Sequence, residues 1–125
     1  MRVLLLGANG QLGSDIARLW RDDRLTLVTA TRLAADVTDG EALEALVETA
    51  RPNVVINTTA FHNLPVCEQD PETCFRVNVV GGWNVARAAA RHGAAVVQFS
   101  TDYVFDGREG APHPENSIQR NGLTR

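Results

Sequence analysis

The feature that most constrains the fold of this chain is a set of three glycines near its start. The heptapeptide Gly-Ala-Asn-Gly-Gln-Leu-Gly at residues 7–13 follows a short apolar run at residues 2–6 and precedes apolar residues at helical spacing. In a loop between a strand and a helix, the first glycine permits the tight turn, the second lets the backbone approach a pyrophosphate, and the third packs the helix on the strand. The anion then faces the N–H groups and the positive end of the helix dipole. The heptapeptide therefore predicts a dinucleotide site, the alternative being a glycine-rich turn without a ligand.

The rest of the chain alternates apolar runs with helical patterns, which is typical of βαβ units and a parallel sheet. Strands are predicted at residues 2–6, 25–29, 53–57 and 94–100. With right-handed crossovers, they predict an α/β, Rossmann-like, doubly wound parallel sheet, truncated at about four strands in the order 3-2-1-4. The fourth strand is then an edge without charge or proline, so we expect something to cover it: a missing second half, or a second copy in a homodimer through the sheet edge or a helix face.

Helix boundaries also leave local signals. Thr38 followed by Glu41 resembles a capping box that opens a helix ending near Ala50. Asp70, followed by a proline, predicts the cap and first turn of a long helix. That helix should end at residue 92, because Gly93 suits the position just past a C-terminus.

The bulk properties bound the organisation and exclude several function classes. The 125 residues fit one domain, and we predict a partial NAD(P)-binding domain at residues 1–107 with a weakly ordered polar tail at 108–125. A net charge of −3 provides no basic field for nucleic acid or an anionic membrane. The apolar runs are shorter than the roughly 20 residues that span a bilayer, so we expect a cytoplasmic protein.

The two cysteines, Cys67 and Cys74, lie seven positions apart in a segment that reads as helical. Seven residues of continuous helix rise about 10.5 Å, beyond the roughly 7 Å over which two Cα atoms can be bridged. No matched set of further ligands is near them, so no metal site is predicted. We expect two reduced thiols.

The end of the second strand selects between the two nicotinamide dinucleotides. An acidic residue there would bind the ribose 2′-hydroxyl, whereas an arginine accommodates a 2′-phosphate. Here Arg32 follows the strand and no carboxylate appears before Asp36. This favours NADP(H) over NAD(H), the other interpretation being that Arg32 is a solvated loop charge.

A family resemblance becomes specific at this point. The glycine loop, the Asp-Val-Thr-Asp segment at 36–39, Asn-Thr-Thr-Ala-Phe at 57–61, Val-Asn-Val at 77–79 and Ser-Thr-Asp-Tyr-Val-Phe-Asp-Gly at 100–107 occur in order. Together they resemble the dTDP-4-dehydrorhamnose reductases, extended members of the short-chain dehydrogenase/reductase superfamily, over about residues 1–115. The resemblance implies NAD(P)H-dependent reduction of the 4-keto group of a dTDP-linked sugar in dTDP-rhamnose biosynthesis.

The resemblance also implies roles for individual residues. Asp36 and Val37 would contact the adenine, Asn78 would support the site from a helix, and Thr101 would polarise the substrate carbonyl. Asp102, Tyr103 and His62 would border the sugar pocket. The expected cofactor-binding residues are Gly7, Asn9, Gly10, Gln11, Leu12, Gly13, Arg32, Asp36, Val37, Thr59, Ala60 and Phe61.

Carbonyl reduction in this family uses a tyrosine that donates a proton and a lysine four positions later. The lysine lowers the pKa of the tyrosine, which is ordinarily about 10 and poorly matched to neutral pH. This chain has one tyrosine, Tyr103, and no lysine, so we expect the 125 residues to be inactive. Two other functions fit the same motifs: an NADP-binding regulatory subunit similar to that of methionine adenosyltransferase, and a nucleotide-sugar epimerase or dehydratase.

Overall fold

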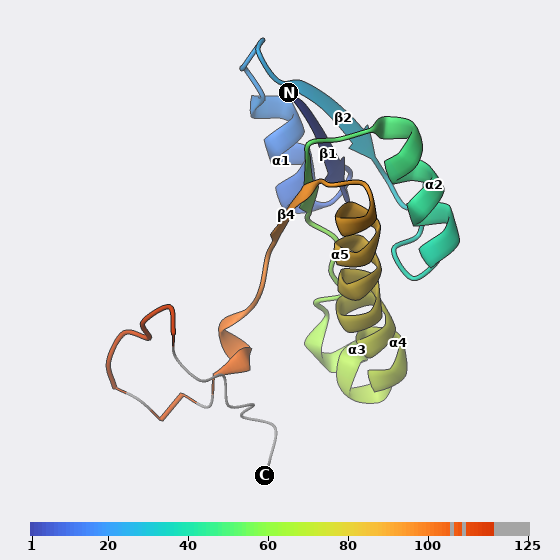
Figure 1. Ribbon diagram of the computed structural model, residues 1–125. Helices are drawn as coiled ribbons and strands as arrows, with labels where there is room; N and C mark the ends of the chain where they lie inside the picture. Colours follow the sequence, from blue (N-terminus) through green and yellow to red (C-terminus); the bar gives the residue numbers. More distant parts are fainter. Residues whose placement is uncertain (106, 109, 117–125) are drawn as a thin grey trace.

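The computed structural model describes residues 1–105, 107–108 and 110–116, and within them a parallel sheet lies between helices (Figure 1). The strands are β1 (Arg2–Leu6), β2 (Thr26–Ala30), β3 (Val54–Asn57) and β4 (Ala95–Gln98). The helices are α1 (Gln11–Leu19), α2 (Gly40–Ala50), α3 (Leu64–Gln69), α4 (Pro71–Phe75) and α5 (Gly81–Arg91). A π-helical turn (Arg76–Val80) joins α4 to α5, and a 3₁₀ turn (Asp102–Val104) follows β4.

The predicted Rossmann-like parallel sheet is confirmed, with a strand order close to the predicted one. The observed order is β2-β1-β3-β4, with Leu4 paired to Val28 on one side and to Val55 on the other. In the predicted order 3-2-1-4, the third strand would have lain outside the second. It lies beside β1 instead, because the chain reverses direction across the sheet after two strands, and residues 31–39 leave β2 without pairing as a strand.

The two faces of the sheet are covered by different helices. Figure 1 shows α1 on one face and α2 with α5 on the other. This division follows from right-handed crossovers, since connections that cross the sheet in opposite directions place their helices on opposite faces. Alternate residues of β1 point to each side, and the main core lies under α2 and α5. Its fully buried members include Leu4, Leu6, Leu43, Val47, Val55, Val85 and Ala89.

Of the three predicted helix boundaries, one is wrong and two are confirmed. The N-cap of α2 is Asp39 and not Thr38, because the Asp39 carboxylate accepts the N–H groups of Glu41 and Ala42. Thr38 instead bonds to Asp36. Asp70 caps α4 by accepting from the Thr73 N–H, as predicted, and Gly93 follows α5 with a φ of 67°.

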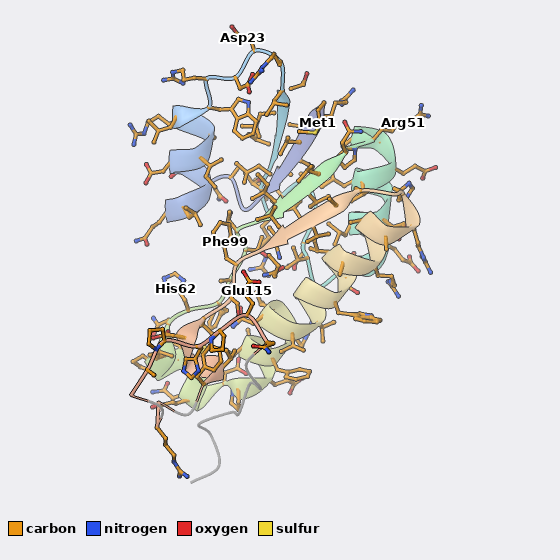
Figure 2. All side chains as sticks on the ribbon, turned by 60° about the vertical axis from the view of Figure 1, so that its left-hand side comes forward. Met1, Asp23, Arg51, His62, Phe99 and Glu115 are labelled. Atoms are coloured by element: carbon orange, nitrogen blue, oxygen red, sulfur yellow. The ribbon has the colours of Figure 1, made fainter. Side chains whose placement is uncertain are left out.

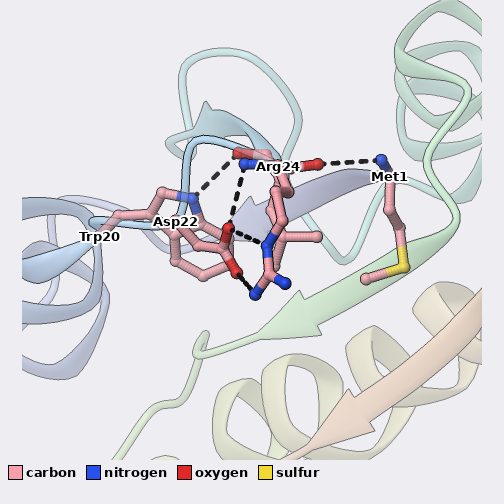
Figure 3. A network of polar contacts seen from close by, with 5 residues as sticks. Met1, Trp20, Asp22 and Arg24 are labelled. Carbon is pink, nitrogen blue, oxygen red and sulfur yellow. Dashed lines mark hydrogen bonds and ion pairs between the residues drawn. The ribbon is translucent and has the colours of Figure 1, made fainter.

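The sheet has two chemically distinct ends. Figure 2 shows Met1, Asp23 and Arg51 at one end, and His62 and Phe99 toward the other. At the Met1 end, Figure 3 shows the α1–β2 connection held by polar contacts. The terminal amine of Met1 donates to the Arg24 carbonyl at 3.3 Å, and the Arg24 guanidinium pairs with Asp22 at 3.0 Å. The opposite end, where the strands finish, is free of this network.

The region after the sheet differs from the rest of the molecule. All four residues of β4 are exposed, as expected for an edge strand, and residues 99–105 lead away from the sheet (Figure 1). Of the tail predicted at 108–125, residues 109 and 117–125 lie outside the described residues. No helix in the described segments is both long and apolar enough to cross a membrane.

Candidate functional site

A cleft of about 220 Å³ opens at the carboxyl ends of β1, β2 and β3. This is the edge at which ligands bind in open parallel sheets, because the loops that leave adjacent strands diverge there. Its walls come from the glycine loop, the segment after β2, the segment after β3 and the π-helical turn. The lining residues are Leu6, Gly7, Asn9, Gly10, Ala30, Thr31, Arg32, Ala35, Asp36, Val37, Thr58, Thr59, Ala60, Phe61 and Val77.

The glycine loop owes its shape to two positions that exclude a side chain. Gly7 has a φ of +78°, a conformation that costs an L-residue strain, and a Cβ there would lie 2.8 Å from the Thr58 hydroxyl. At Gly13, a Cβ would lie 2.2 Å from the Gly7 carbonyl oxygen, so the first turn of α1 packs directly on the backbone that follows β1. Gly10 is different: it lines the cleft, and a Cβ there would meet, among the described residues beyond its chain neighbours, only the Gly7 oxygen at 3.3 Å.

The N-terminus of α1 is suited to an anion. Gly10 is its N-cap and provides no side-chain oxygen, and the first turn contains no acidic residue. By contrast, α2 and α4 are capped by Asp39 and Asp70. The first N–H groups of a helix have no intrahelical partner and carry the positive end of its dipole, so α1 presents donors and partial positive charge beside the cleft.

The segment after β2 holds a carboxylate with three donors. Asp36 accepts from the Thr38 N–H and hydroxyl, both at 2.9 Å, and from the Arg32 guanidinium at 2.8 Å. The Thr38 N–H bond is the main cause that lowers the pKa of Asp36 below its ordinary value. The Arg32 side chain is 83% exposed, so its guanidinium meets solvent at the mouth of the cleft while one nitrogen remains bonded to Asp36.

The segment after β3 is organised by a buried amide. Asn57 is 1% exposed, and its oxygen accepts from the Thr59 N–H at 3.1 Å and from the Thr59 hydroxyl at 2.6 Å. Its amide nitrogen donates to Gln98 of β4 at 2.8 Å. The Thr58 hydroxyl donates to the Leu6 carbonyl at 2.7 Å, which ties this segment to the start of the glycine loop.

The π-helical turn fixes the far wall. Asn78 lies in this turn, and its side chain both accepts from the Phe61 N–H and donates to the Phe61 carbonyl, each at 2.8 Å. The predicted long helix is thus interrupted by a widened turn. Such turns shift the side chains that follow them and are frequent at functional sites. Here the turn presents the Asn78 amide to the backbone of Phe61, which lines the cleft, and the role of Asn78 in cofactor binding stays a prediction.

The structure brings most predicted cofactor residues into one cleft, but not all of them. Gln11 and Leu12 are exposed on the first turn of α1, and Gly13 is buried beneath it, so none of the three lines the cleft. The lining residues that sequence reasoning missed include Thr58 and Val77. Thr58 sits beside predicted Thr59, and its signal would have been a hydroxyl at the end of a buried strand.

The predicted substrate residues lie outside this cleft. His62 is exposed at the end of the segment after β3 (Figure 2). Thr101 and Asp102 are exposed beyond β4, and the Thr101 hydroxyl donates to the Asp102 carboxylate at 3.3 Å. The side chain of Tyr103 and residue Asp106 fall outside the described residues. No group of three or more metal-ligating side chains occurs in the part of the chain that the structure describes.

Comparisons with known proteins agree with this architecture. A family model described as the RmlD substrate binding domain matches residues 1–120. A dTDP-4-dehydrorhamnose reductase from Aggregatibacter actinomycetemcomitans is 35% identical over 118 residues, which cover 94% of this chain and 40% of that protein. The chain therefore spans about two fifths of the length of this relative.

Two solved structures show the same fold. The crystal structure of a dTDP-4-dehydrorhamnose reductase from Clostridium acetobutylicum matches with a TM-score of 0.90 and 35% identity, covering 97% of this chain and 43% of that one. The structure of a dTDP-4-dehydrorhamnose reductase from Bacillus anthracis in complex with NADP matches with a TM-score of 0.83 and 30% identity. That match covers 86% of this chain and 39% of the other.

Proposed function

The chain belongs to the RmlD substrate binding domain family, and on this premise we propose that it is the NADP(H)-binding portion of a dTDP-4-dehydrorhamnose reductase. The observation that carries the proposal is the cleft at the strand ends. It combines the glycine loop, the N-terminus of α1 without a side-chain cap, and an exposed arginine after β2. These are the three elements that a dinucleotide with a 2′-phosphate requires.

Each part of the cofactor has a matching group in the cleft. The pyrophosphate would face the N–H groups of the first turn of α1, since the Gly10 N–H already donates to the Gly7 carbonyl at 2.9 Å. The 2′-phosphate would pair with Arg32, whose long exposed side chain can leave Asp36 or bridge the two groups. Val37 is buried beside Asp36 and would form an apolar floor for the adenine, while Thr59, Ala60 and Phe61 would border the nicotinamide side.

The cofactor would supply a hydride for a substrate carbonyl, and the protein must bind, orient and protonate. For this chain we propose only that it binds and orients the cofactor. The family's Tyr-x-x-x-Lys pair is absent from these 125 residues, since four residues after Tyr103 stands Gly107 and the sequence has no lysine. We propose that the 125-residue chain does not reduce a dTDP-linked 4-keto sugar by itself, and that Thr101 would polarise the carbonyl only in a protein that also has the proton donor.

The test is a titration of the folded chain with NADPH and with NADH, followed by the amide signals of residues 9–13. We expect these signals to shift at lower concentrations of NADPH than of NADH. Arg32→Gln keeps a polar side chain but removes the guanidinium group and its charge, so it should weaken NADPH binding and leave NADH binding nearly unchanged. Amide signals that neither dinucleotide moves would refute the proposal, and turnover by the 125-residue chain would refute the part that concerns inactivity.

A further inference from the structure

Two thiols converge on one backbone oxygen in the wall of the cleft. The Cys67 sulfur in α3 donates to the Phe61 carbonyl at 3.6 Å, and the Cys74 sulfur in α4 contacts the same oxygen at 3.8 Å. The Asn78 amide, which clamps Phe61, also donates to the Cys74 sulfur at 3.3 Å. Both cysteines are half-buried, and Phe61 lines the cleft.

The break between α3 and α4 creates this arrangement. In one straight helix, as predicted from the sequence, the seven positions between the two cysteines would correspond to a rise of about 10.5 Å. Instead, α3 ends at Asp70, whose φ of −132° and ψ of 73° are not helical, and α4 starts again at Pro71. Figure 1 shows the two short helices side by side, so their thiols face the same carbonyl.

The two thiols are chemically unequal. A hydrogen bond with the Cys74 side chain, which holds the proton on the Cys67 sulfur, is the main cause that raises the pKa of Cys67 to about 11, so Cys67 stays protonated at neutral pH. The Cys74 sulfur lies beside a different group, because it accepts the Asn78 amide N–H at 3.3 Å. Because the thiolate is the nucleophile in cysteine chemistry, Cys74 is the residue that should react first with an oxidant.

We propose that Cys67 and Cys74 are a reversible modification site, which a peroxide converts to an intramolecular disulfide. The Cys74 thiolate attacks one peroxide oxygen, the O–O bond breaks, and Cys74 becomes a sulfenic acid; the departing hydroxide takes up the proton that Cys74 lost on ionising and leaves as water. The Cys67 sulfur then attacks the Cys74 sulfur, the S–O bond breaks, and the proton of Cys67 leaves with the hydroxide as a second water. Two electrons pass from the two sulfurs to the peroxide, and a dithiol reductant reverses the change.

The disulfide would alter the wall of the cleft. Its formation removes both S–H donors from the Phe61 carbonyl and pulls the Cys74 sulfur toward α3. The hydrogen bonds of Asn78 to Phe61 must then adjust, because Asn78 contacts both groups. The effect on the cofactor rests on the proposed function: we expect the oxidised chain to bind NADPH about fivefold more weakly, as for the loss of one modest hydrogen bond.

The test is oxidation of the native chain with hydrogen peroxide, followed by alkylation and intact-mass measurement. We expect the parent to lose the mass of two hydrogen atoms and take up no label, and to take up two labels after reduction. Cys67→Ser should give a sulfenic acid at Cys74 that a dimedone probe traps, whereas Cys74→Ser should react more slowly. Labelling of the peroxide-treated parent, oxygen addition without bridging, or a link between two copies would overturn the proposal.

A second measurement separates this site from the proposed function. NADPH titrations of the reduced and the oxidised parent test the coupling, with the oxidised Cys67→Ser/Cys74→Ser variant as the control that should not change. A disulfide that forms but leaves both NADPH affinity and the Phe61 amide signal unmoved would overturn the coupling. A reduced parent that binds no NADPH would count against the proposed function, whereas the mass measurement would still decide the disulfide.

Discussion

The glycine loop offers a matched pair of substitutions with opposite expected effects. Gly13→Ala places a methyl group 2.2 Å from the Gly7 carbonyl oxygen, 2.8 Å from the Gly7 carbonyl carbon and 2.8 Å from the Thr58 hydroxyl. Gly10→Ala places a methyl group 3.3 Å from the Gly7 oxygen, and no other atom of the described residues beyond its chain neighbours lies within 4 Å of it. The two substituted glycines lie three positions apart in the sequence, and both variants make the same chemical change. Each variant is therefore the control for the other.

The structure sets the size of each effect on folding. Ordinary contact begins near 3.4 Å, so α1 must move from β1 by about 1 Å to admit the methyl group at residue 13. Because the obstacle is backbone, this overpacking should cost about 3 kcal/mol of unfolding free energy, a large part of a small domain's stability. Gly10 has a φ of −76° and a ψ of 174°, which alanine adopts readily, so Gly10→Ala should cost less than about 1 kcal/mol as a poorer N-cap.

For NADPH binding, we expect Gly10→Ala to be the harmful substitution, although it costs little in folding. The methyl group at residue 10 occupies the side of the loop that a pyrophosphate approaches, so Gly10→Ala should weaken NADPH binding by about tenfold or more while the chain stays folded. The assay is urea unfolding followed by circular dichroism, together with an NADPH titration of each variant. The reasoning is refuted if Gly13→Ala unfolds at the same urea concentration as the parent, or if Gly10→Ala binds NADPH with the affinity of the parent.

Three further predictions concern stability. The carboxylate of Asp36 has a lowered pKa, so its stabilisation is present at neutral pH and is lost as the pH falls below about 4. The difference in unfolding free energy between the parent and Asp36→Asn, measured by urea unfolding, should be under about 1 kcal/mol at pH 7 and should vanish in acid. Asn57→Ala leaves the Thr59 N–H and Gln98 without their buried partner, and should cost about 2–3 kcal/mol in urea unfolding. Leu43→Ala opens a cavity at a fully buried position and should lower thermal stability by about 2–5 kcal/mol without changing NADPH affinity per folded molecule.

The sequence was sufficient where a local rule determines the outcome. A short apolar run ended by glycine predicted β1 and the loop after it, since these residue types suit few other conformations. Asp70 before a proline predicted a helix start, and the carboxylate does accept the Thr73 N–H. At Thr38 the same kind of rule failed, because two hydroxyl or carboxylate side chains lie next to each other and Asp39 reaches the N–H groups of α2.

The strand order could not be read in the same way. Periodicity identifies a strand but not the direction in which the next crossover runs, and that direction depends on which face accepts the following helix. Residues 31–39 bond within themselves through Asp36 and Thr38 and do not extend the sheet, and their sequence does not indicate on which side of β1 the third strand pairs.

The convergence of the two thiols was also hidden from the sequence. Apolar spacing of three and four residues continues across the whole segment from residue 75 to residue 89, and it carries no mark of a π-helical turn. Nor does the spacing of Cys67 and Cys74 reveal the break at Asp70, although the same aspartate was identified as a cap. Asp70 both ends α3 and caps α4. A helical rise counted along the chain therefore does not give the distance between two residues on either side of it.

Cofactor binding and turnover should be separable in this molecule, because the cofactor half and the substrate half of its proposed site are built differently. The proposed cofactor half is fixed by contacts among β1, β2, β3 and the π-helical turn, as in the bonds from Thr58 to Leu6 and from Asn78 to Phe61. The predicted substrate half, around Thr101 and Asp102, is exposed beyond an edge strand whose Val97 is 45% exposed. The relatives are more than twice as long, and in them more chain is available to order that half. NADPH binding without turnover would therefore follow from this difference between a proposed cofactor half that is fixed by contacts and a predicted substrate half that is exposed.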